Sequence, residues 1–230
     1  MARGTFEKKS YLSCSQGKWR QRVDKSNPDA KLRIAEGSDG SKREVYELVD
    51  DYVEGRIQKI WVDEHDKFGR SWAIQIYDGK ETMVLQVNLD SGYSTHMISK
   101  LANCDLSKPI MFIPYYFEEE KKTVMVLMQN GSKIQSHFTK EHPNGFPPFP
   151  DGGDKDDIKI WKASANKFLI KFVEKNIIPK LPDDDQVALD NLDSGEFPQY
   201  PEEEKKKGEK DTGYQDDVPF PDETSDLPFN

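Results

Sequence analysis

The sequence predicts a mainly β protein in which one short internal helix interrupts a series of strands and a C-terminal amphipathic helix precedes an acidic tail. Three observations lead to this fold class. They are the order of apolar, β-branched segments along the chain, an apolar repeat with helical spacing after residue 157, and a division of charge between the body and the last fifth of the chain. We therefore expect one domain over residues 1–181 and a tail over residues 182–230.

The first three strands are predicted from composition and alternation. Residues 43–63 are rich in Val, Ile, Tyr and Trp and contain Gly55, a pattern that favours one long strand bent at a glycine. Residues 70–77 and 81–89 follow, and the Asp-Gly pair at 78–79 is a favoured two-residue hairpin loop. We expect a hairpin there.

A short helix is predicted over residues 93–103, because apolar residues recur on one helical face. Ser94 or Thr95 could cap its N-terminus. The apolar residues of that face are Met97, Ile98 and Leu101.

Two further strands, residues 110–117 and 123–129, flank a charged turn and predict a second hairpin. The complete order is a long strand, a hairpin, a helix and a second hairpin. This is the order of the five-stranded oligonucleotide-binding barrel, the OB-fold, which places a helix between its third and fourth strands. Another small barrel or an α+β sheet is the alternative that the same pattern allows.

The segments around the predicted barrel are less regular. Residues 10–23 suit an added N-terminal strand or a hairpin around Gly17, and residues 24–40 suggest a polar loop. Residues 132–138 could add a strand, whereas the Pro- and Gly-rich residues 142–153 should be irregular.

A longer amphipathic helix is predicted over residues 157–178, behind acidic residues that suit a helix N-terminus. We expect its apolar stripe to pack on the barrel; an oligomer interface or a partner groove is the alternative. The stripe consists of Trp161, Ala165, Phe168, Leu169, Phe172 and Val173.

The net charge of −9 is unevenly distributed. Residues 182–230 contain 16 acidic and 4 basic residues, so the rest of the chain is slightly basic. The tail has too few apolar residues to offset the entropy of ordering it, and we expect it to be disordered. A slightly basic body remains compatible with nucleic-acid binding.

Catalysis, metal binding and membrane insertion find little support in the sequence. Cys14 and Cys104 are far apart and lack metal-ligand spacing to any histidine, which predicts reduced thiols and no zinc. Neither a glycine-rich phosphate loop nor a nucleophile elbow occurs, and adjacent acids such as Asp50 and Asp51 are typical of charged turns. We expect a protein that is not an enzyme and has no cofactor.

Apolar runs fall far short of the roughly 20 residues that span a bilayer, and the N-terminus has no signal-peptide core. We expect a cytoplasmic protein without a membrane partner.

The tail contains one element twice. Residues 216–220, Asp-Asp-Val-Pro-Phe, are nearly repeated by residues 225–229, Ser-Asp-Leu-Pro-Phe. The second copy resembles the C-terminal peptide of bacterial and phage single-stranded DNA-binding proteins, in which acidic residues precede an aliphatic residue, Pro and Phe. The body shows no N-terminal motif of the bacterial family, so the resemblance is to a divergent, phage-type member acting in the cytoplasm of a bacterial host.

The resemblance implies that the tail docks on replication or repair proteins such as a polymerase, helicase, primase or recombinase. A solubilising acidic tail is the alternative. The residues that would dock are Asp226, Leu227, Pro228 and Phe229, together with Asp217, Pro219 and Phe220 of the first copy.

Single strands bind to cations along a groove and to exposed aromatic rings on which bases stack. Trp19 lies among basic residues, which favours its exposure, and Tyr77 is a better stacking candidate than Trp72, which alternates with apolar residues. Tyr115 and Tyr116 should point to opposite faces, so that one is outside. The candidates are Lys18, Trp19, Arg20, Arg22, Arg56, Lys59, Trp61, Arg70, Trp72, Tyr77, Lys80 and Tyr115.

We therefore expect a non-catalytic protein that binds and protects single-stranded DNA with little sequence preference in DNA replication, recombination or repair. Two alternatives stay open. One is an RNA-binding or chaperone barrel, and the other is an interaction protein that captures host replication factors without binding nucleic acid.

Overall fold

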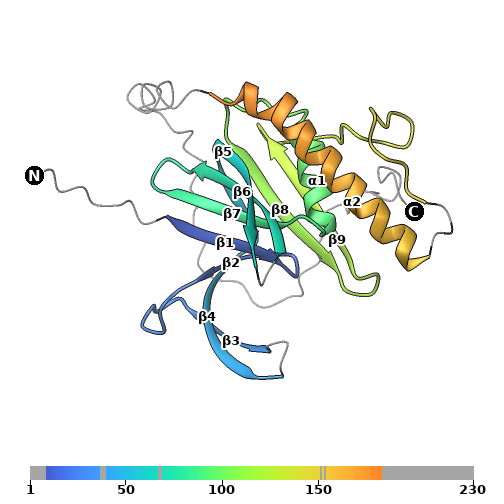
Figure 1. Cartoon of the computed structure of the whole chain (residues 1–230). Helices are drawn as coiled ribbons and strands as arrows, with labels where there is room; N and C mark the ends of the chain where they lie inside the picture. Colours follow the sequence, from blue (N-terminus) through green and yellow to red (C-terminus); the bar gives the residue numbers. More distant parts are fainter. Residues whose placement is uncertain (1–8, 37–39, 67–68, 151, 153, 183–230) are drawn as a thin grey trace, which may run out of the picture.

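The computed structural model of the chain describes residues 9–36, 40–66, 69–150, 152 and 154–182. The described residues are mainly β, with 44% strand and 22% helix. The strands form one open sheet, and a C-terminal helix crosses one side of it (Figure 1). The predicted fold class is confirmed at this level.

The sheet has ten strands in the order β10-β9-β8-β5-β6-β7-β1-β2-β4-β3. All neighbours pair antiparallel except β1 and β7, which are parallel. The strands are β1 Ser10–Ser15, β2 Lys18–Arg22, β3 Lys31–Glu36, β4 Lys42–Asp50, β5 Val53–His65, β6 Gly69–Tyr77, β7 Thr82–Asn88, β8 Ile110–Phe117, β9 Lys122–Gln129 and β10 Ser132–Lys133.

The five predicted barrel strands correspond to β5, β6, β7, β8 and β9. They are neighbours in the sheet, and the helix α1, Gly92–Leu101, lies between the third and fourth of them in sequence. In the described part of the chain, however, β7 pairs with β1 and β9 pairs with β10, so a closed five-stranded barrel is not confirmed.

β5 joins the two halves of the sheet at Gly55. Residues 53–55 pair with β8, and residues 56–65 pair with β6. A Cβ atom on Gly55 would lie 2.9 Å from the carbonyl oxygen of Tyr77, closer than side chains normally approach a backbone. The strand therefore changes partner at the one residue that lets β6 come this close.

Gly55→Ala is expected to lower the free energy of unfolding by about 1–3 kcal/mol, because the added methyl group overpacks a rigid backbone contact. Urea unfolding of the full chain measures this effect. An unchanged midpoint would mean that β6 moves aside without loss.

The prediction of a single strand over residues 43–63 is wrong. The chain leaves the sheet at Asp51 and Tyr52, so that β4 ends at Asp50 and β5 begins at Val53. Because β4 pairs with β2 and β3, whereas β5 pairs with β6 and β8, the two strands belong to different parts of the sheet.

The flanking segments give mixed outcomes. The hairpin around Gly17 is confirmed as β1 and β2. The loop predicted over residues 24–40 is wrong in part, because residues 31–36 form β3, and the added strand predicted over residues 132–138 is only the two-residue β10. In β3, Leu32 and Ile34 alternate with charged residues, which is a strand pattern that the loop prediction overlooked, and the strand pairs with β4.

α1 starts at Gly92 with Ser91 as its N-cap residue, so the predicted caps are wrong. Ser94 is instead buried inside the fold, where its hydroxyl accepts a hydrogen bond of 2.9 Å from the indole nitrogen of Trp72. The Ser94 side chain therefore contributes to tertiary packing and does not cap the helix.

α2, Lys155–Phe172, continues into a π-helical turn, Val173–Ile177, and a 3₁₀ turn, Ile178–Lys180. It begins two residues earlier than predicted, because Asp154 caps it and Asp157 returns the hydrogen bond in a capping box. The stripe packs on the core as predicted; its fully buried members are Ala165, Leu169 and Val173, and Ile177 at the end of the π-helical turn is buried as well.

Aromatic rings fix α2 to the body. Phe138 lies between Phe146, Phe168 and Phe172 at centroid distances of 4.9–5.5 Å. The His137 ring contacts Phe138 edge to face and Phe172 at a tilt. Burial of the imidazole lowers its pKa, and the charge of Lys180 lowers it further. The neutral ring is therefore the form that fits this contact.

The lowered pKa predicts that stability falls as the pH drops through about 6.5, the ordinary histidine range, because the unfolded chain then binds a proton more readily. Urea midpoints at pH 7.5 and 5.5 measure this, and His137→Gln should reduce the difference between them. An equal acid loss in this variant would assign the effect to other groups.

The tail residues 183–230, with their two Pro-Phe elements and the disorder expected of them, lie outside the described residues. No helix in the described ranges combines the length and apolar character that a membrane span needs.

Candidate nucleic-acid interface

The sheet surface that points away from the hydrophobic core carries a concentration of polar side chains. Strand alternation sends Leu12, Trp72 and Leu85 into the core, and the residues between them to the other face. In the register of the sheet, one row of cross-strand partners on that face consists of Trp61, Ala73, Gln86, Ser13, Arg20 and Val49. We call this surface of β1 to β7 the polar face.

Cations outnumber acids on the polar face, so its potential favours an anionic ligand. The register and the hydrogen bond of Lys9 to Gln75 place on it the cations Lys9, Lys18, Arg20, Arg22, Lys31, Arg33, Arg43, Arg56 and Lys59, and the acids Glu47, Glu54 and Asp63.

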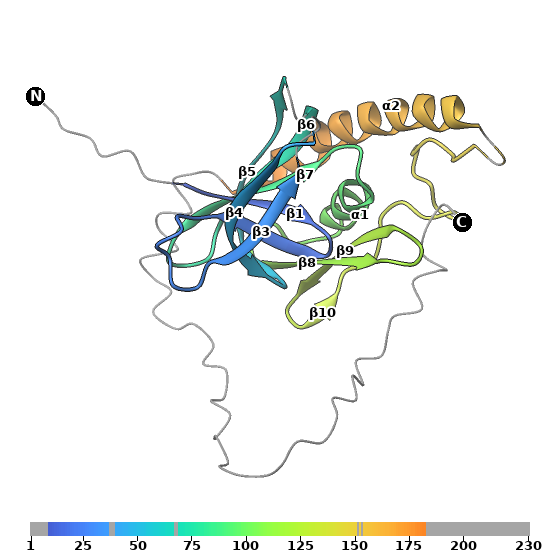
Figure 2. The same ribbon diagram turned by 90° about the horizontal axis from the view of Figure 1, so that it is seen from below.

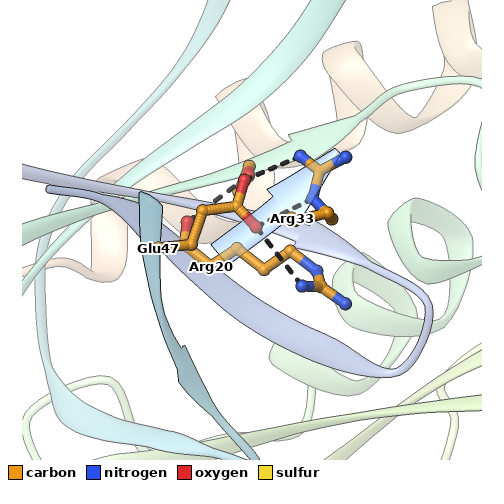
Figure 3. A network of polar contacts seen from close by, with 4 residues as sticks. Arg20, Arg33 and Glu47 are labelled. Atoms are coloured by element: carbon orange, nitrogen blue, oxygen red, sulfur yellow. Dashed lines mark hydrogen bonds and ion pairs between the residues drawn. The ribbon is translucent and has the colours of Figure 1, made fainter. Parts of the chain in front are cut away.

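Three charged residues from three strands meet on this face (Figure 3). Arg33 of β3 donates two hydrogen bonds to the carboxylate of Glu47 on β4, from Nη2 at 2.7 Å and from Nε at 2.9 Å. Arg20 of β2 donates from Nη1 to the same carboxylate at 3.3 Å. Glu47 is only 3% exposed, so it ties β2, β3 and β4 together from within the sheet.

The cluster keeps a positive charge because one carboxylate faces two guanidinium groups. The hydrogen bonds from Arg33 lower the pKa of Glu47, and the nearby charge of Arg20 adds to this effect. The hydrogen bond to Glu47 raises the pKa of Arg33 in turn. Glu47 and Arg33 are thus both ionised near neutral pH, and the Arg33 side chain, 41% exposed, remains accessible to a ligand.

A hollow of about 1170 Å³ lies over the centre of the polar face. Its walls include the uncharged side chains of Ser13, Ser71, Gln86 and Asn88, together with Arg20 and Arg22 of β2. Asp24 and Asp63 also line it. Hydroxyl and amide groups beside arginines can accept and donate hydrogen bonds to sugar, phosphate or base without selecting one sequence.

Two aromatic rings on the polar face are open to a ligand. Tyr11 is 52% exposed and Trp61 is 36% exposed, whereas Tyr77 is half-buried and donates its hydroxyl hydrogen to the carbonyl oxygen of Gly79 at 2.9 Å. Tyr11 on β1 and Trp61 on β5 lie on either side of β6 and β7. They are the rings best placed for stacking.

The structure corrects the assignment of Trp19 and Trp72 to ligand stacking. Trp19 has no exposed surface, and its indole nitrogen donates to the carbonyl oxygen of Phe112 at 2.9 Å. Trp72 is 1% exposed. Both rings occupy the core-facing positions of their strands, and the basic residues beside Trp19 point the other way because alternate side chains of a strand face opposite sides.

Of the other predicted residues, Arg20, Arg22, Arg56, Lys59, Trp61 and Tyr77 lie together on the polar face. Lys18 lies there too and forms an ion pair with Asp51. Arg70 and Lys80 are exposed at the two ends of the β6–β7 hairpin, where Arg70 continues the core-facing alternation of β6. Arg70 and Lys80 are therefore not part of the candidate site on the polar face.

Tyr115 lies on β8, apart from the polar face. It is 41% exposed and Tyr116 is 37% exposed, so both rings of the pair are partly outside, although only one was expected to be. The β1–β2 turn packs beside them: a Cβ on Gly17 would lie 3.0 Å from the backbone nitrogen of Tyr116.

Sequence reasoning missed Lys9, Tyr11 and Arg33. Alternation within Ser10–Ser15 could have placed Tyr11 opposite the core-facing Leu12, because the two are adjacent. No local signal could have identified Arg33, since its role depends on the pairing of β3 with β4.

The described residues include no group of three or more His, Cys, Asp or Glu side chains that could hold a metal ion. Burial raises the pKa of the thiols of Cys14 and Cys104 to about 12 each, which disfavours the reactive thiolate.

Comparison of the chain with protein-family models, with curated proteins and with solved structures gave no match.

Proposed function

We propose that this protein binds and protects single-stranded DNA on the polar face, with little sequence preference, during DNA replication, recombination or repair. The observation that carries the proposal is the placement of Arg20, Arg22 and Lys59 on the same sheet surface as the exposed rings of Tyr11 and Trp61. Cations follow the phosphates and rings receive the bases, and stacking contributes about 1–3 kcal/mol per base.

The same surface favours a single strand over a duplex. In a duplex the bases are stacked on one another, so rings on a protein surface reach only their edges. A single strand can lay its phosphates along the arginines and its unstacked bases on Tyr11 and Trp61. The hydroxyl and amide groups of the hollow leave sequence preference low.

We further propose that β5 to β9 with α1 form an oligonucleotide-binding barrel to which β1 to β4 are added. The strand order and the position of α1 support this assignment. The β1–β2 hairpin also lies against β8, through the indole hydrogen bond of Trp19 to Phe112 and the contact of Gly17 with Tyr116. In this arrangement β1 and β2 occupy the gap that direct pairing of β7 with β9 would close.

The tail completes the proposal. Its acidic Pro-Phe elements, residues 216–220 and 225–229, offer replication or repair proteins an aromatic anchor flanked by negative charge. Such a segment suits a hydrophobic pocket rimmed by basic residues.

Fluorescence anisotropy of labelled oligo(dT) with the full chain, across a salt series, tests the proposed function. We expect binding whose affinity falls steeply with salt, because phosphate contacts release counterions. Oligo(U) and a DNA duplex of equal length are the comparators, and both should bind more weakly.

Stronger binding of oligo(U) would instead support the RNA-binding alternative, since the 2′-hydroxyl group distinguishes the two ligands along with the thymine methyl. No binding of any oligonucleotide at low salt would overturn the proposal and favour the interaction protein.

A further inference from the structure

A second hollow lies on the opposite side of the fold, between the two helices. α1 lies between α2 and the β8–β9 hairpin (Figure 2), and Asn166 of α2 donates to the carboxylate of Asp90 before α1 at 2.7 Å. The space between the N-terminal half of α2, α1 and the β8–β9 turn measures about 770 Å³. We call it the helix groove.

The helix groove is mainly apolar at its base. Phe138 and Ala165 are buried beneath it, and Ile158, Trp161 and Phe149 form one wall. The Trp161 and Phe149 rings meet edge to face at a centroid distance of 5.0 Å, and the Trp161 indole nitrogen donates to the carbonyl oxygen of Pro147 at 3.1 Å. This wall is therefore held in place before any ligand arrives.

Charged groups stand at the rim. Lys121 comes from the β8–β9 turn, Lys122 begins β9, and Lys162 comes from α2. The acids of the lining are Glu120 and Asp90, and Asp90 accepts the hydrogen bond from Asn166. The lining therefore has three lysines and two acids beside an aromatic wall.

Two segments of the chain, both outside the described residues, combine apolar side chains with negative charges that are complementary to these lysines. Residues 216–220 and 225–229 each carry aspartate followed by an aliphatic residue, Pro and Phe. An aliphatic-Pro-Phe unit can bury its apolar side chains against Trp161, Phe149 and Ile158, while the preceding carboxylates meet the lysines.

The chain between the end of α2 and the Pro-Phe elements is long enough for this contact to form within one molecule. Helical rise places the far end of the helix groove, at Ile158, about 36 Å from Pro182, where the described chain ends. The residues from Pro182 to Asp216 can span up to about 110 Å, so both Pro-Phe elements can reach the helix groove. Tethering also raises the effective concentration of the segment at the site to the millimolar range.

We propose that the helix groove binds the acidic Pro-Phe elements of the protein's own tail, in cis. The site is separate from the polar face and does not rest on nucleic-acid binding. An element held in the groove is unavailable to other proteins, so the groove and the tail's partners compete for the same residues. The two copies of the element let one occupy the groove while the other stays accessible.

Photo-cross-linking in the full chain tests this proposal. Phe229, and separately Phe220, is replaced by p-benzoylphenylalanine, and the attachment points are mapped by mass spectrometry after irradiation. We expect attachment within residues 158–166 or 95–99 of the same chain. Lys121→Glu together with Lys162→Glu should reduce the yield about five-fold, which corresponds to about 1 kcal/mol for the two exposed charge pairs together.

The matched control is Lys159→Glu with Lys167→Glu, which reverses two exposed charges of α2 that do not line the groove. The control should keep the yield of the parent chain. Attachment to the strands of the polar face, attachment between two copies of the chain, no attachment, or an equal loss in both charge-reversed chains would each overturn the proposal. Because no oligonucleotide is present, this outcome is independent of the DNA-binding test.

Discussion

Reversing the charge of Arg22 and Lys59 with Arg22→Glu and Lys59→Glu is expected to weaken binding of the full chain to oligo(dT) by about 100-fold at low salt. Both side chains are exposed on the polar face, on β2 and β5 respectively, so one substitution lies on each side of the central strands. The change removes two phosphate contacts and adds repulsion. It should also flatten the dependence of log affinity on log salt by about two.

Lys159→Glu with Lys167→Glu is again the control, because it changes the net charge equally from the α2 side of the molecule. If the affinity falls by the same factor in the control, the total charge rather than the polar face determines binding. If neither variant changes an observed affinity, the nucleic acid binds elsewhere.

Replacing Glu47 with alanine is expected to lower the free energy of unfolding by about 3 kcal/mol, the lower end of the range for breaking a buried ion pair. The carboxylate is almost fully buried and faces the guanidinium groups of Arg20 and Arg33. Its removal leaves Arg20, whose side chain is 15% exposed, with an uncompensated charge inside the sheet. Arg33 can turn to solvent, which keeps the effect from being larger.

Urea unfolding of the full chain measures this loss. Glu44→Ala is the control, because Glu44 is exposed on the other side of β4 and surface substitutions change stability by about 0.5 kcal/mol or less. Equal small effects of both substitutions would mean that β2, β3 and β4 hold together without the Glu47 carboxylate.

The acid dependence of stability provides a second readout for Glu47. Its pKa is lowered in the folded protein, so its contribution is complete above the ordinary glutamate pKa of about 4.3 and is lost as the pH falls through the lowered value. Glu47→Gln should therefore reduce the stability difference between pH 6 and pH 3. The His137 effect lies at higher pH, and the two windows can be separated.

Much of the strand pattern could be predicted because it depends on neighbours in sequence. Alternation and turn residues identified the β6–β7 and β8–β9 hairpins, and apolar spacing identified α2 with the stripe that it buries. These signals are local: residues on one face of a strand recur at every second position, and residues on one face of a helix recur at every third or fourth position. The register of β5 with β6 pairs Trp61 with Ala73 and places it on the polar face.

The orientation of individual side chains depended on pairing between distant segments. Trp19 lies among basic residues, yet its ring fills the core because β2 pairs with β1 and packs beside β8. Ser94 suits a helix cap, yet its hydroxyl serves the buried indole of Trp72. A buried polar group that lacks a partner is costly, so such contacts prevail over local preference.

Composition and short-range spacing were enough to identify the division of charge, the mainly β body, the two helices and the repeated acidic Pro-Phe element. Only the folded chain shows that β3 pairs with β4, that Arg20 and Arg33 share Glu47, and that Tyr11 and Trp61 lie on one surface. These features escape a local pattern because the polar face and the helix groove are assembled from strands and helices far apart in sequence. Their register is set by hydrogen bonding and core packing, which no local pattern records.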